Sequence, residues 1–217
     1  MNDRITYRIK FSKLDRIRFI GHLDLLNVFG RAFNRAKLPV AYSQGFNPHQ
    51  EISFALPLSL GYHSIAEYLD VIFSKEADIE EIKIKLNDVL PEGLAVLDVA
   101  KTEKGKKNSA STLTKARYEV YLPANSNITE NHIKMVMESD IVEVSKKNKK
   151  KQESIINIRP DIFELELCEK TLKMLISAGS NKNLKAELVV KYLYSLAGEE
   201  YLPHKTGYKR IEMCFNE

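Results

Sequence analysis

The amino-acid sequence predicts an α+β protein, and three patterns support this prediction. Short stretches that alternate apolar and polar residues, as half-buried strands do, recur along the chain. Between them lie segments with apolar residues three and four apart, as in amphipathic helices. In residues 1–100 these elements follow the order βαββαβ, which is that of a ferredoxin-like domain.

The first strand and helix are the clearest elements. Residues 5–12 alternate apolar with polar side chains, which indicates a strand whose outer face is basic. A helix follows from His22, with Asp24 in the first turn, where the helix dipole favours an anion. It ends before Pro39, which cannot continue a helix. The apolar stripe of this helix comprises Leu25, Leu26, Phe29, Ala32, Phe33 and Ala36.

The next segment, residues 40–64, is rich in glycine and proline and is expected to be mostly loop. A short strand is predicted within it at residues 52–56. A strand at 67–73, an amphipathic helix over 79–90 and a strand at 94–99 complete the first domain.

The rest of the chain predicts a linker and a second domain. Residues 101–115 hold one large apolar side chain, Leu113, which favours a linker or loop. Residues 116–217 are expected to form a second α+β domain. Its element order is similar to that of the first domain, which is what a degenerate internal duplication would produce. The lysine run at 146–151 is expected at a hairpin tip. The predicted strands are 117–122, 141–146, 154–158, 163–168, 171–177 and 207–215, and the helices are 129–138 and 184–197.

Composition favours a cytoplasmic protein. The chain is 44% hydrophobic and 29% charged, an ordinary globular balance. No apolar run approaches the roughly 18–20 residues of a membrane-spanning helix, and the N-terminus lacks the apolar core of a signal peptide. Two cysteines, Cys168 and Cys214, do not make a disulfide framework.

Charge is unevenly distributed. The formal net charge is only +4, but residues 1–60 hold nine Lys and Arg against the four acids Asp3, Asp15, Asp24 and Glu51. A local basic excess favours an anionic partner such as RNA.

The sequence lacks several motifs that would identify a catalyst or a cofactor site. It has no cysteine spacing for an iron–sulfur cluster or a zinc site, no glycine-rich phosphate or dinucleotide loop, and no nucleophile elbow. We therefore expect that the protein binds no cofactor. We also expect a non-catalytic protein more than an enzyme. The RNA-recognition consensus of ferredoxin-like sheets is also missing.

Two polar segments are candidate sites. His22 and Asp24 would suit proton transfer or metal binding, or simply cap the helix. In the segment 42–49, aromatic side chains would stack on bases while amides and His49 read base edges. The alternative is a loop whose polar groups satisfy its own backbone.

A metal site is weighed and not adopted. His63, Glu67 and Asp70, with His22 and His49, are hard nitrogen and oxygen ligands. However, Glu67 and Asp70 lie on opposite faces of their strand because side chains alternate. The candidate binding residues are His22, Asp24, Arg31, Arg35, Tyr42, Ser43, Gln44, Phe46, Asn47, His49, His63 and Glu67.

A long motif resembles a known family. The run from Arg18 to Val71, RFIGHLDLLNVFGRAFNRAKLPVAYSQGFNPHQEISFALPLSLGYHSIAEYLDV, resembles the opening of the radical-SAM-linked protein family, a bacterial domain of unknown function. INIRPDI and KTGYKR resemble that family's second half. The matched positions are Gly21, His22, Asp24, Ser43, Gln44, Gly45, Asn47, Pro48, His49, Gly61, Glu67 and Asp70.

The resemblance implies an accessory role. Members of that family are fused to, or encoded beside, cobalamin-binding radical SAM proteins, and stand-alone genes lie near those for ribosomal proteins and a ribonuclease of the E/G type. A radical SAM protein is therefore the implied partner. We expect a module that presents an RNA, either tRNA or rRNA, to such an enzyme. The alternatives are a protein–protein adaptor, and an enzyme or metal-binding protein that uses His22, Asp24 and His49.

Overall fold

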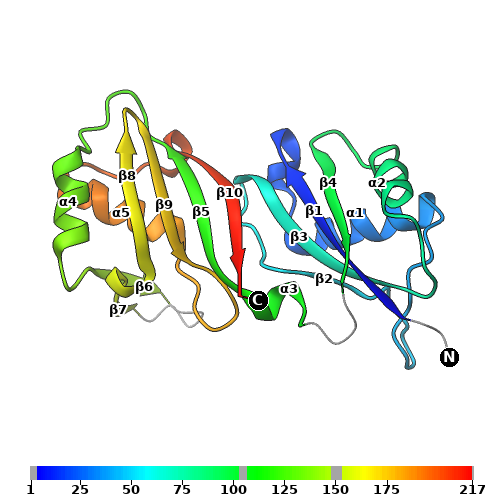
Figure 1. The fold of residues 1–217 in the computed structure, drawn as a ribbon. Coiled ribbons are helices and arrows are strands. Elements are labelled where there is room, and N and C mark those ends of the chain that lie inside the picture. The colour runs from blue at the N-terminus through cyan, green and yellow to red at the C-terminus, as the bar shows by residue number, and fades with distance from the viewer. Residues whose placement is uncertain (1–3, 103–106, 148–152, 217) are drawn as a thin grey trace. The chain divides into compact units, whose positions relative to one another are not determined.

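The computed structural model describes residues 4–102, 107–147 and 153–216, and these form two compact units. Unit 1 comprises residues 1–113 and 213–217, and unit 2 comprises residues 114–212. Each unit combines a β-sheet with helices (Figure 1), so the predicted α+β class is confirmed.

Unit 1 is ferredoxin-like in both element order and strand order. Its elements are β1 (Ile5–Lys13), α1 (His22–Arg35), β2 (Ile52–Phe54), β3 (His63–Phe73), α2 (Ile79–Asn87) and β4 (Leu94–Lys101), with a short helix η1 (Asp15–Phe19) after β1. The sheet order is β4-β1-β3, and β2 pairs with the other edge of β3. All three pairings are antiparallel. This is the order expected of a βαββαβ domain.

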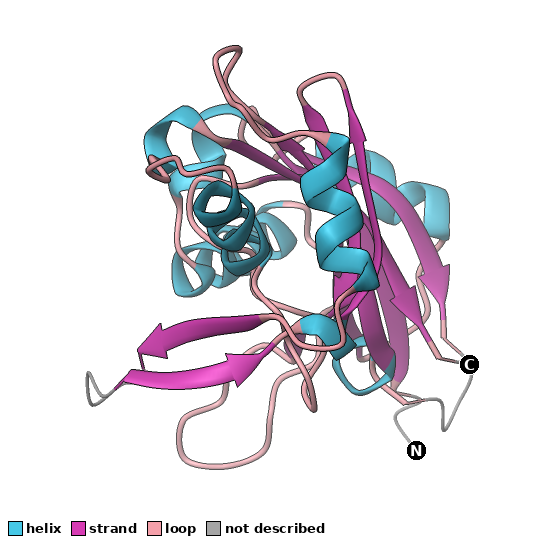
Figure 2. Ribbon diagram, turned by 90° about the vertical axis from the view of Figure 1, so that its left-hand side faces the viewer, coloured by secondary structure: helices cyan, strands magenta, loops and turns pink. Residues whose placement is uncertain are grey.

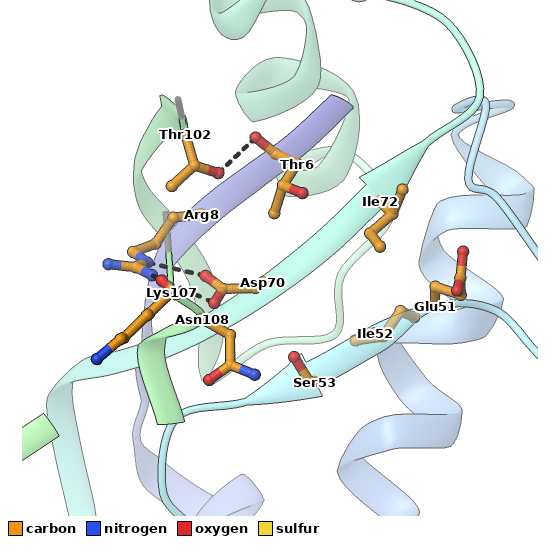
Figure 3. Close-up of a pocket in the computed structure, with 10 residues that line it drawn as sticks. All are labelled: Thr6, Arg8, Glu51, Ile52, Ser53, Asp70, Ile72, Thr102, Lys107 and Asn108. Atoms are coloured by element: carbon orange, nitrogen blue, oxygen red, sulfur yellow. Dashed lines mark hydrogen bonds and ion pairs between the residues drawn. The ribbon is translucent and has the colours of Figure 1, made fainter. Parts of the chain in front are cut away.

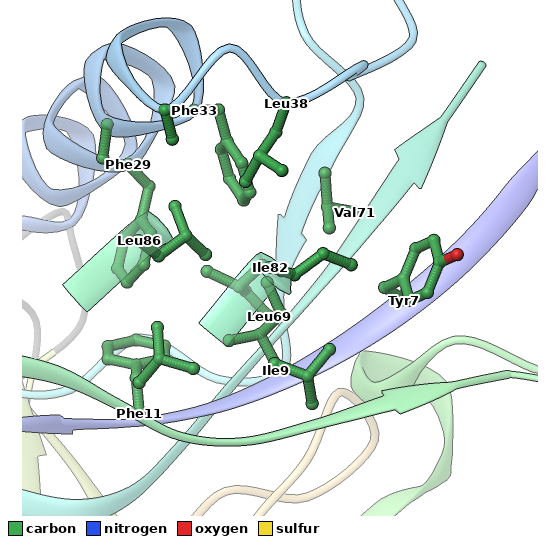
Figure 4. Packing of buried hydrophobic residues seen from close by; sticks show 14 of the residues in the cluster. Tyr7, Ile9, Phe11, Phe29, Phe33, Leu38, Leu69, Val71, Ile82 and Leu86 are labelled. Carbon is green, nitrogen blue, oxygen red and sulfur yellow. The ribbon is translucent and has the colours of Figure 1, made fainter. Parts of the chain in front are cut away.

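The two long helices of unit 1 cover the same face of its sheet. Alternate residues of β1 point into the core, and among them Tyr7, Ile9 and Phe11 are fully buried. Phe29 and Phe33 of α1 reach the same core at helical spacing, as does Leu86 of α2 (Figure 4). The opposite face of the sheet carries the alternate residues of the same strands.

Local signals set the limits of α1 and α2. Helix α1 begins after Gly21, which has an extended conformation, and ends shortly before Lys37, which adopts a positive φ of 53°. Asp78 caps α2, because its side chain accepts a 2.9 Å hydrogen bond from the backbone N–H of Glu81.

Unit 2 repeats the topology of unit 1 with one insertion. Its elements are β5 (Leu113–Tyr121), α4 (Glu130–Glu138), β8 (Ile162–Cys168), β9 (Thr171–Ser177), α5 (Ala186–Leu196) and β10 (Gly207–Phe215), with short helices η2 (Arg159–Asp161) and η3 (Pro203–Lys205). The sheet order β10-β5-β9-β8 corresponds to β4-β1-β3-β2 of unit 1. The shared order is the one expected from an internal duplication.

The insertion is the two-stranded sheet of β6 (Glu143–Lys147) and β7 (Glu153–Asn157), which forms a separate ribbon (Figure 2). The hairpin tip predicted for the lysine run at 146–151 falls mainly on residues 148–152, which lie outside the described residues.

The segment 101–115, expected to be a linker, has regular structure in its described part. Lys101 ends β4, a short helix α3 spans Ser109–Thr112, and β5 begins at Leu113. Ser109 is fully buried. Two strands start four residues earlier than predicted: β3 at His63 instead of Glu67, and β5 at Leu113 instead of Arg117. The other element boundaries lie closer to the predictions.

Two further findings concern the chain as a whole. None of the helices in the described residues has both the length and the apolar character needed to cross a membrane. Cys168 is exposed and Cys214 is partly buried, and neither forms a disulfide bond.

Candidate functional site

The predicted loop 42–49 folds back on itself. The backbone N–H of Ser43 donates to the carbonyl of His49 at 2.8 Å, and the backbone N–H of His49 donates to the Ser43 hydroxyl at 3.1 Å. The same hydroxyl lies 2.9 Å from Nδ1 of His49. Ser43 and His49 therefore come together, and their polar groups stabilise the loop that carries them.

The other predicted residues of this loop point toward solvent. Tyr42 is 48% exposed and Phe46 fully exposed, and Gln44 and Asn47 are exposed as well. Phe46 thus has no surrounding wall that would position a stacked base.

The two other predicted histidines, His22 and His63, have different neighbours. His22, the first residue of α1, packs edge-on against Phe54 with ring centroids 5.2 Å apart. His63 accepts a hydrogen bond from the guanidinium of Arg18 at Nε2. Asp24 is exposed in the first turn of α1. In the described residues, no three His, Cys, Asp or Glu side chains gather as metal ligands would.

The predicted arginines lie on α1, and Glu67 lies on β3. Arg31 is exposed on α1, and Arg35 donates to the backbone carbonyl of Val89 at 2.6 Å. Glu67 is 3% exposed and lies on the core side of β3, whereas Asp70 lies on the opposite side, as alternation predicts.

The face of the unit 1 sheet that α1 and α2 leave uncovered holds a different constellation. On this face Arg8 of β1 pairs with Asp70 of β3, and Lys10 of β1 pairs with Tyr68 of β3. Arg8 donates to Asp70 from Nε at 2.8 Å and from Nη2 at 3.3 Å. A backbone N–H, that of Ser109 in α3, donates to Asp70 at 2.6 Å. Asp70 therefore joins β1, β3 and α3.

Cations and aromatic rings alternate beside this ion pair. The amine of Lys10 lies 5.9 Å from the ring centroid of Tyr68, and the guanidinium of Arg8 lies 5.4 Å from that of Phe215. The rings of Tyr68 and Phe215 meet edge to face at 5.0 Å. All four side chains are partly exposed. We call Arg8, Lys10, Tyr68 and Phe215 the sheet-face cluster.

A pocket opens next to this cluster. Its volume is about 240 Å³, and Figure 3 shows the residues that line it, which come from β1, β2, β3, the end of β4 and the segment around Asn108. Arg8 belongs to both features, because it lines the pocket and also contacts Phe215. We call this cavity the sheet-face pocket. It is lined by Thr6, Arg8, Glu51, Ile52, Ser53, Asp70, Ile72, Thr102, Lys107 and Asn108.

The charges of the face nearly balance. The carboxylate of Glu51 is paired with Arg4, and that of Asp70 with Arg8. Asp98 of β4 lies across from Lys10 and is exposed. A ligand on this face therefore gains more from stacking and hydrogen bonds than from net positive charge.

The corresponding face of unit 2 also carries ion pairs. Arg117 of β5 forms ion pairs with Glu164 and, at 3.1 Å, with Glu212. The hydrogen bond and the charge of Arg117 lower the pKa of Glu164, and those of Glu164 raise the pKa of Arg117. Lys115 lies 4.0 Å from the ring centroid of Phe163. Arg117 and Lys115 thus contact acids and a ring, as Arg8 and Lys10 do in unit 1.

Most of the sheet-face cluster was not predictable from the sequence. The alternation of residues 5–12 placed Arg8 and Lys10 on one basic face, which was the available signal. Nothing in the local sequence linked them to Tyr68 or to Phe215, because the pairing register and the course of the chain bring these residues together.

Solved structures with a resembling fold are of low identity. A chain in "Crystal Structure of a Cbf5-Nop10-Gar1 Complex" aligns with a TM-score of 0.45 at 10% identity, covering 94% of this chain and 47% of that one. An unknown protein from Galdieria sulphuraria aligns with a TM-score of 0.31 at 11% identity, covering 96% and 98% of the two chains. This chain thus spans about half of the first structure's chain.

The comparison of sequences gives a family. No curated protein matches the chain. A family model does match, over residues 6–186, which is most of unit 1 and much of unit 2. The chain belongs to the family described as "Uncharacterized protein conserved in bacteria (DUF2344)".

Proposed function

We propose that this protein is a non-catalytic accessory module that holds single-stranded RNA for a radical SAM enzyme. The observation that carries the RNA part is the sheet-face cluster, where two cations and two aromatic rings lie side by side on the sheet face opposite α1 and α2. Aromatic rings stack on unpaired bases, and neighbouring cations neutralise phosphates. The radical SAM partner rests on the family resemblance of the segment from Arg18 to Val71.

The cluster fits a single strand better than a duplex. Tyr68 and Phe215 are partly exposed, which leaves ring surface for a base. Stacking of one base on an aromatic side chain contributes about 1–3 kcal/mol. Since acids on the same face offset its cations, we expect few phosphate contacts and a shallow dependence of affinity on salt. Two such contacts, by Lys10 and Lys107, would give a slope of about −1.4 in a plot of log K against log salt concentration.

The test is RNA binding by matched variants. Tyr68→Leu keeps an apolar side chain but removes the stacking ring, so the affinity for a labelled single-stranded RNA should fall about 5- to 150-fold, the equivalent of the stacking free energy. Tyr192→Leu, on α5 of unit 2, is the matched control and should leave the affinity unchanged. Equal affinities of the two variants would contradict the assignment of the cluster.

A second variant pair tests the phosphate contact. Lys10→Met should lower affinity for all single strands alike and reduce the salt slope by about 0.7, the contribution of one phosphate contact. Lys83→Met, on α2, makes the same change on the helix layer of unit 1. A wild-type protein that binds no RNA at low salt would end the proposal.

A protein–protein adaptor is the second candidate, and an exposed apolar surface favours it. Phe19 is 61% exposed, Leu60 63% and Leu23 72%. Phe19 and the loop that carries Leu60 are adjacent, because the N–H of Gly61 donates to the carbonyl of Arg18 at 3.0 Å. Apolar side chains gathered on a surface often mark protein interfaces.

The adaptor form has its own test. In a co-purification with the cobalamin-binding radical SAM protein of the same organism, Leu23→Glu should abolish capture while RNA binding persists. If capture instead survives Leu23→Glu but is lost with Tyr68→Leu or after nuclease treatment, RNA bridges the two proteins and the adaptor role is refuted.

A further inference from the structure

We infer that the sheet-face pocket receives one unstacked nucleobase of the bound strand. The inference rests on the proposed function, since it names the part of the RNA that this cavity would take. Three properties of the pocket carry it: its size, its charge state, and its position beside the aromatic rings.

The size suits a small planar group. At about 240 Å³ the cavity has room for about eight water molecules at ~30 Å³ each. It is smaller than the ~300–1,000 Å³ of sites that take drug-sized ligands. Ile72, on the same face of β3 as Asp70, supplies an apolar surface against which a flat ring can lie (Figure 3).

The charges disfavour a phosphate in the pocket. Two carboxylates, those of Glu51 and Asp70, line it, and Arg8 already donates to Asp70 from two nitrogens. The side chain of Lys107 extends away from the centre of the cavity in Figure 3. An anionic group would therefore meet two acids whose nearest cations are engaged. A neutral group avoids this repulsion.

Neutral polar groups line the pocket where a base edge would lie. The hydroxyls of Thr6 and Ser53 can each donate and accept, and the carboxamide of Asn108 does both. The carboxamide oxygen of Asn108 accepts from the N–H of Ser111 at 2.9 Å, so its NH₂ remains the donor available to a ligand. This mixture of donors and acceptors is the kind that reads the edge of an unpaired base.

The position connects the pocket to the rings. Because Arg8 lines the pocket and also contacts Phe215, a base stacked on Tyr68 or Phe215 would have its neighbour in the strand close to the cavity mouth. The Arg8–Asp70 ion pair, to which the N–H of Ser109 also donates, lies between the two positions.

The experiment compares two RNAs on the full chain. The first is a labelled single-stranded oligoribonucleotide. The second is a series of variants of that oligonucleotide, each with one abasic residue at a different position. In the wild type we expect one abasic position, next to a position that depends on Tyr68, to lower affinity about tenfold. Ser53→Leu, which fills the pocket from an exposed strand position, should lower the affinity for intact RNA and abolish that particular abasic effect.

Controls separate the possible outcomes. Ser145→Leu, at an exposed position of β6, should keep the wild-type abasic profile. An unchanged abasic profile in Ser53→Leu would overturn the inference while leaving RNA binding intact. A free nucleoside that binds as tightly as the strand would also overturn it, by identifying a small molecule as the occupant. Absence of any RNA binding would refute the proposed function and this inference together.

Discussion

The hydrogen bonds that Asp70 accepts from Arg8 and Ser109 predict a large loss of stability for the substitution Asp70→Asn. Asp70 is 4% exposed and accepts three hydrogen bonds, two from the guanidinium of Arg8 and one from the backbone of α3. The replacement removes the negative charge and turns an NH₂ group toward donors. The one remaining oxygen can no longer serve all three donors, so at least one N–H of Arg8 or of Ser109 loses its acceptor, while the shape of the side chain hardly changes.

The magnitude follows from the burial of the pair. Removing one partner of a buried ion pair costs about 3–5 kcal/mol. The side chain of Arg8 is 20% exposed, so it can partly rehydrate, and we expect the lower end, about 3 kcal/mol. At about 1.4 kcal/mol per factor of ten, this corresponds to a roughly hundredfold increase in the population of the open state.

The assay is amide hydrogen exchange measured residue by residue. The N–H of Ser109 reports locally, because it donates to Asp70 itself at 2.6 Å. Its exchange should accelerate about a hundredfold in Asp70→Asn if α3 detaches with the loss of this acceptor. Urea unfolding monitored on unit 1 should show a fall of about 3 kcal/mol.

The matched control is Asp98→Asn, the same substitution at an exposed position of the same sheet. Surface substitutions of this kind usually stay within about 0.5 kcal/mol. The contradicting result is that Asp70→Asn changes the free energy of unfolding and the exchange rate of the Ser109 N–H no more than Asp98→Asn does. In that case Asp70 does not hold β1, β3 and α3 together, and the Arg8–Asp70 pair does not form the wall of the sheet-face pocket.

The remaining predictions concern backbone strain and pH. Gly93→Ala should lower the free energy of unfolding, measured in urea, more than Gly198→Ala does. Both glycines have positive φ, but a Cβ on Gly93 would lie 2.8 Å from the carbonyl oxygen of Leu14, whereas a Cβ on Gly198 would meet open space. Equal losses in the two variants would show that only the backbone conformation matters. Burial raises the pKa of Tyr201, whose hydroxyl lies 2.9 Å from that of Tyr208. The unfolded chain therefore ionises first, and the stability that Tyr201 contributes is present below its ordinary pKa of about 10 and lost as pH rises through the folded-state pKa. Tyr201→Phe should reduce the alkaline loss of stability, and an unchanged pH profile between the two proteins would contradict this.

Much of the fold was predictable because it follows from local periodicity. The alternation along β1 and the spacing of Leu25, Phe29 and Phe33 in α1 reflect burial of one face against a common core. The order βαββαβ then allows few arrangements of the sheet. The start of β3 was missed because His63 and the residues after it do not alternate clearly between apolar and polar types.

The site was less predictable because its residues are distant in sequence. Arg8 and Asp70 are 62 positions apart, and their meeting depends on the exact register of β1 against β3. A shift by one residue would turn Arg8 into the core. Phe215 comes from the other end of the chain.

The loop 42–49 illustrates the opposite difficulty. Its variety of polar side chains resembled a binding segment, yet Ser43 and His49 hydrogen-bond to each other across the loop. Donors and acceptors that recognise a ligand and those that close a turn have the same composition, so only geometry separates the two uses.

The central claim, that the uncovered sheet face of unit 1 binds single-stranded RNA, is tested most directly by mapping backbone amide NMR shifts while an oligoribonucleotide is added. We predict that the largest changes fall on Thr6, Lys10, Tyr68 and Ile72, in β1 and β3. Changes confined to the loop 42–49 or to unit 2, or no changes at saturating RNA, would contradict the account.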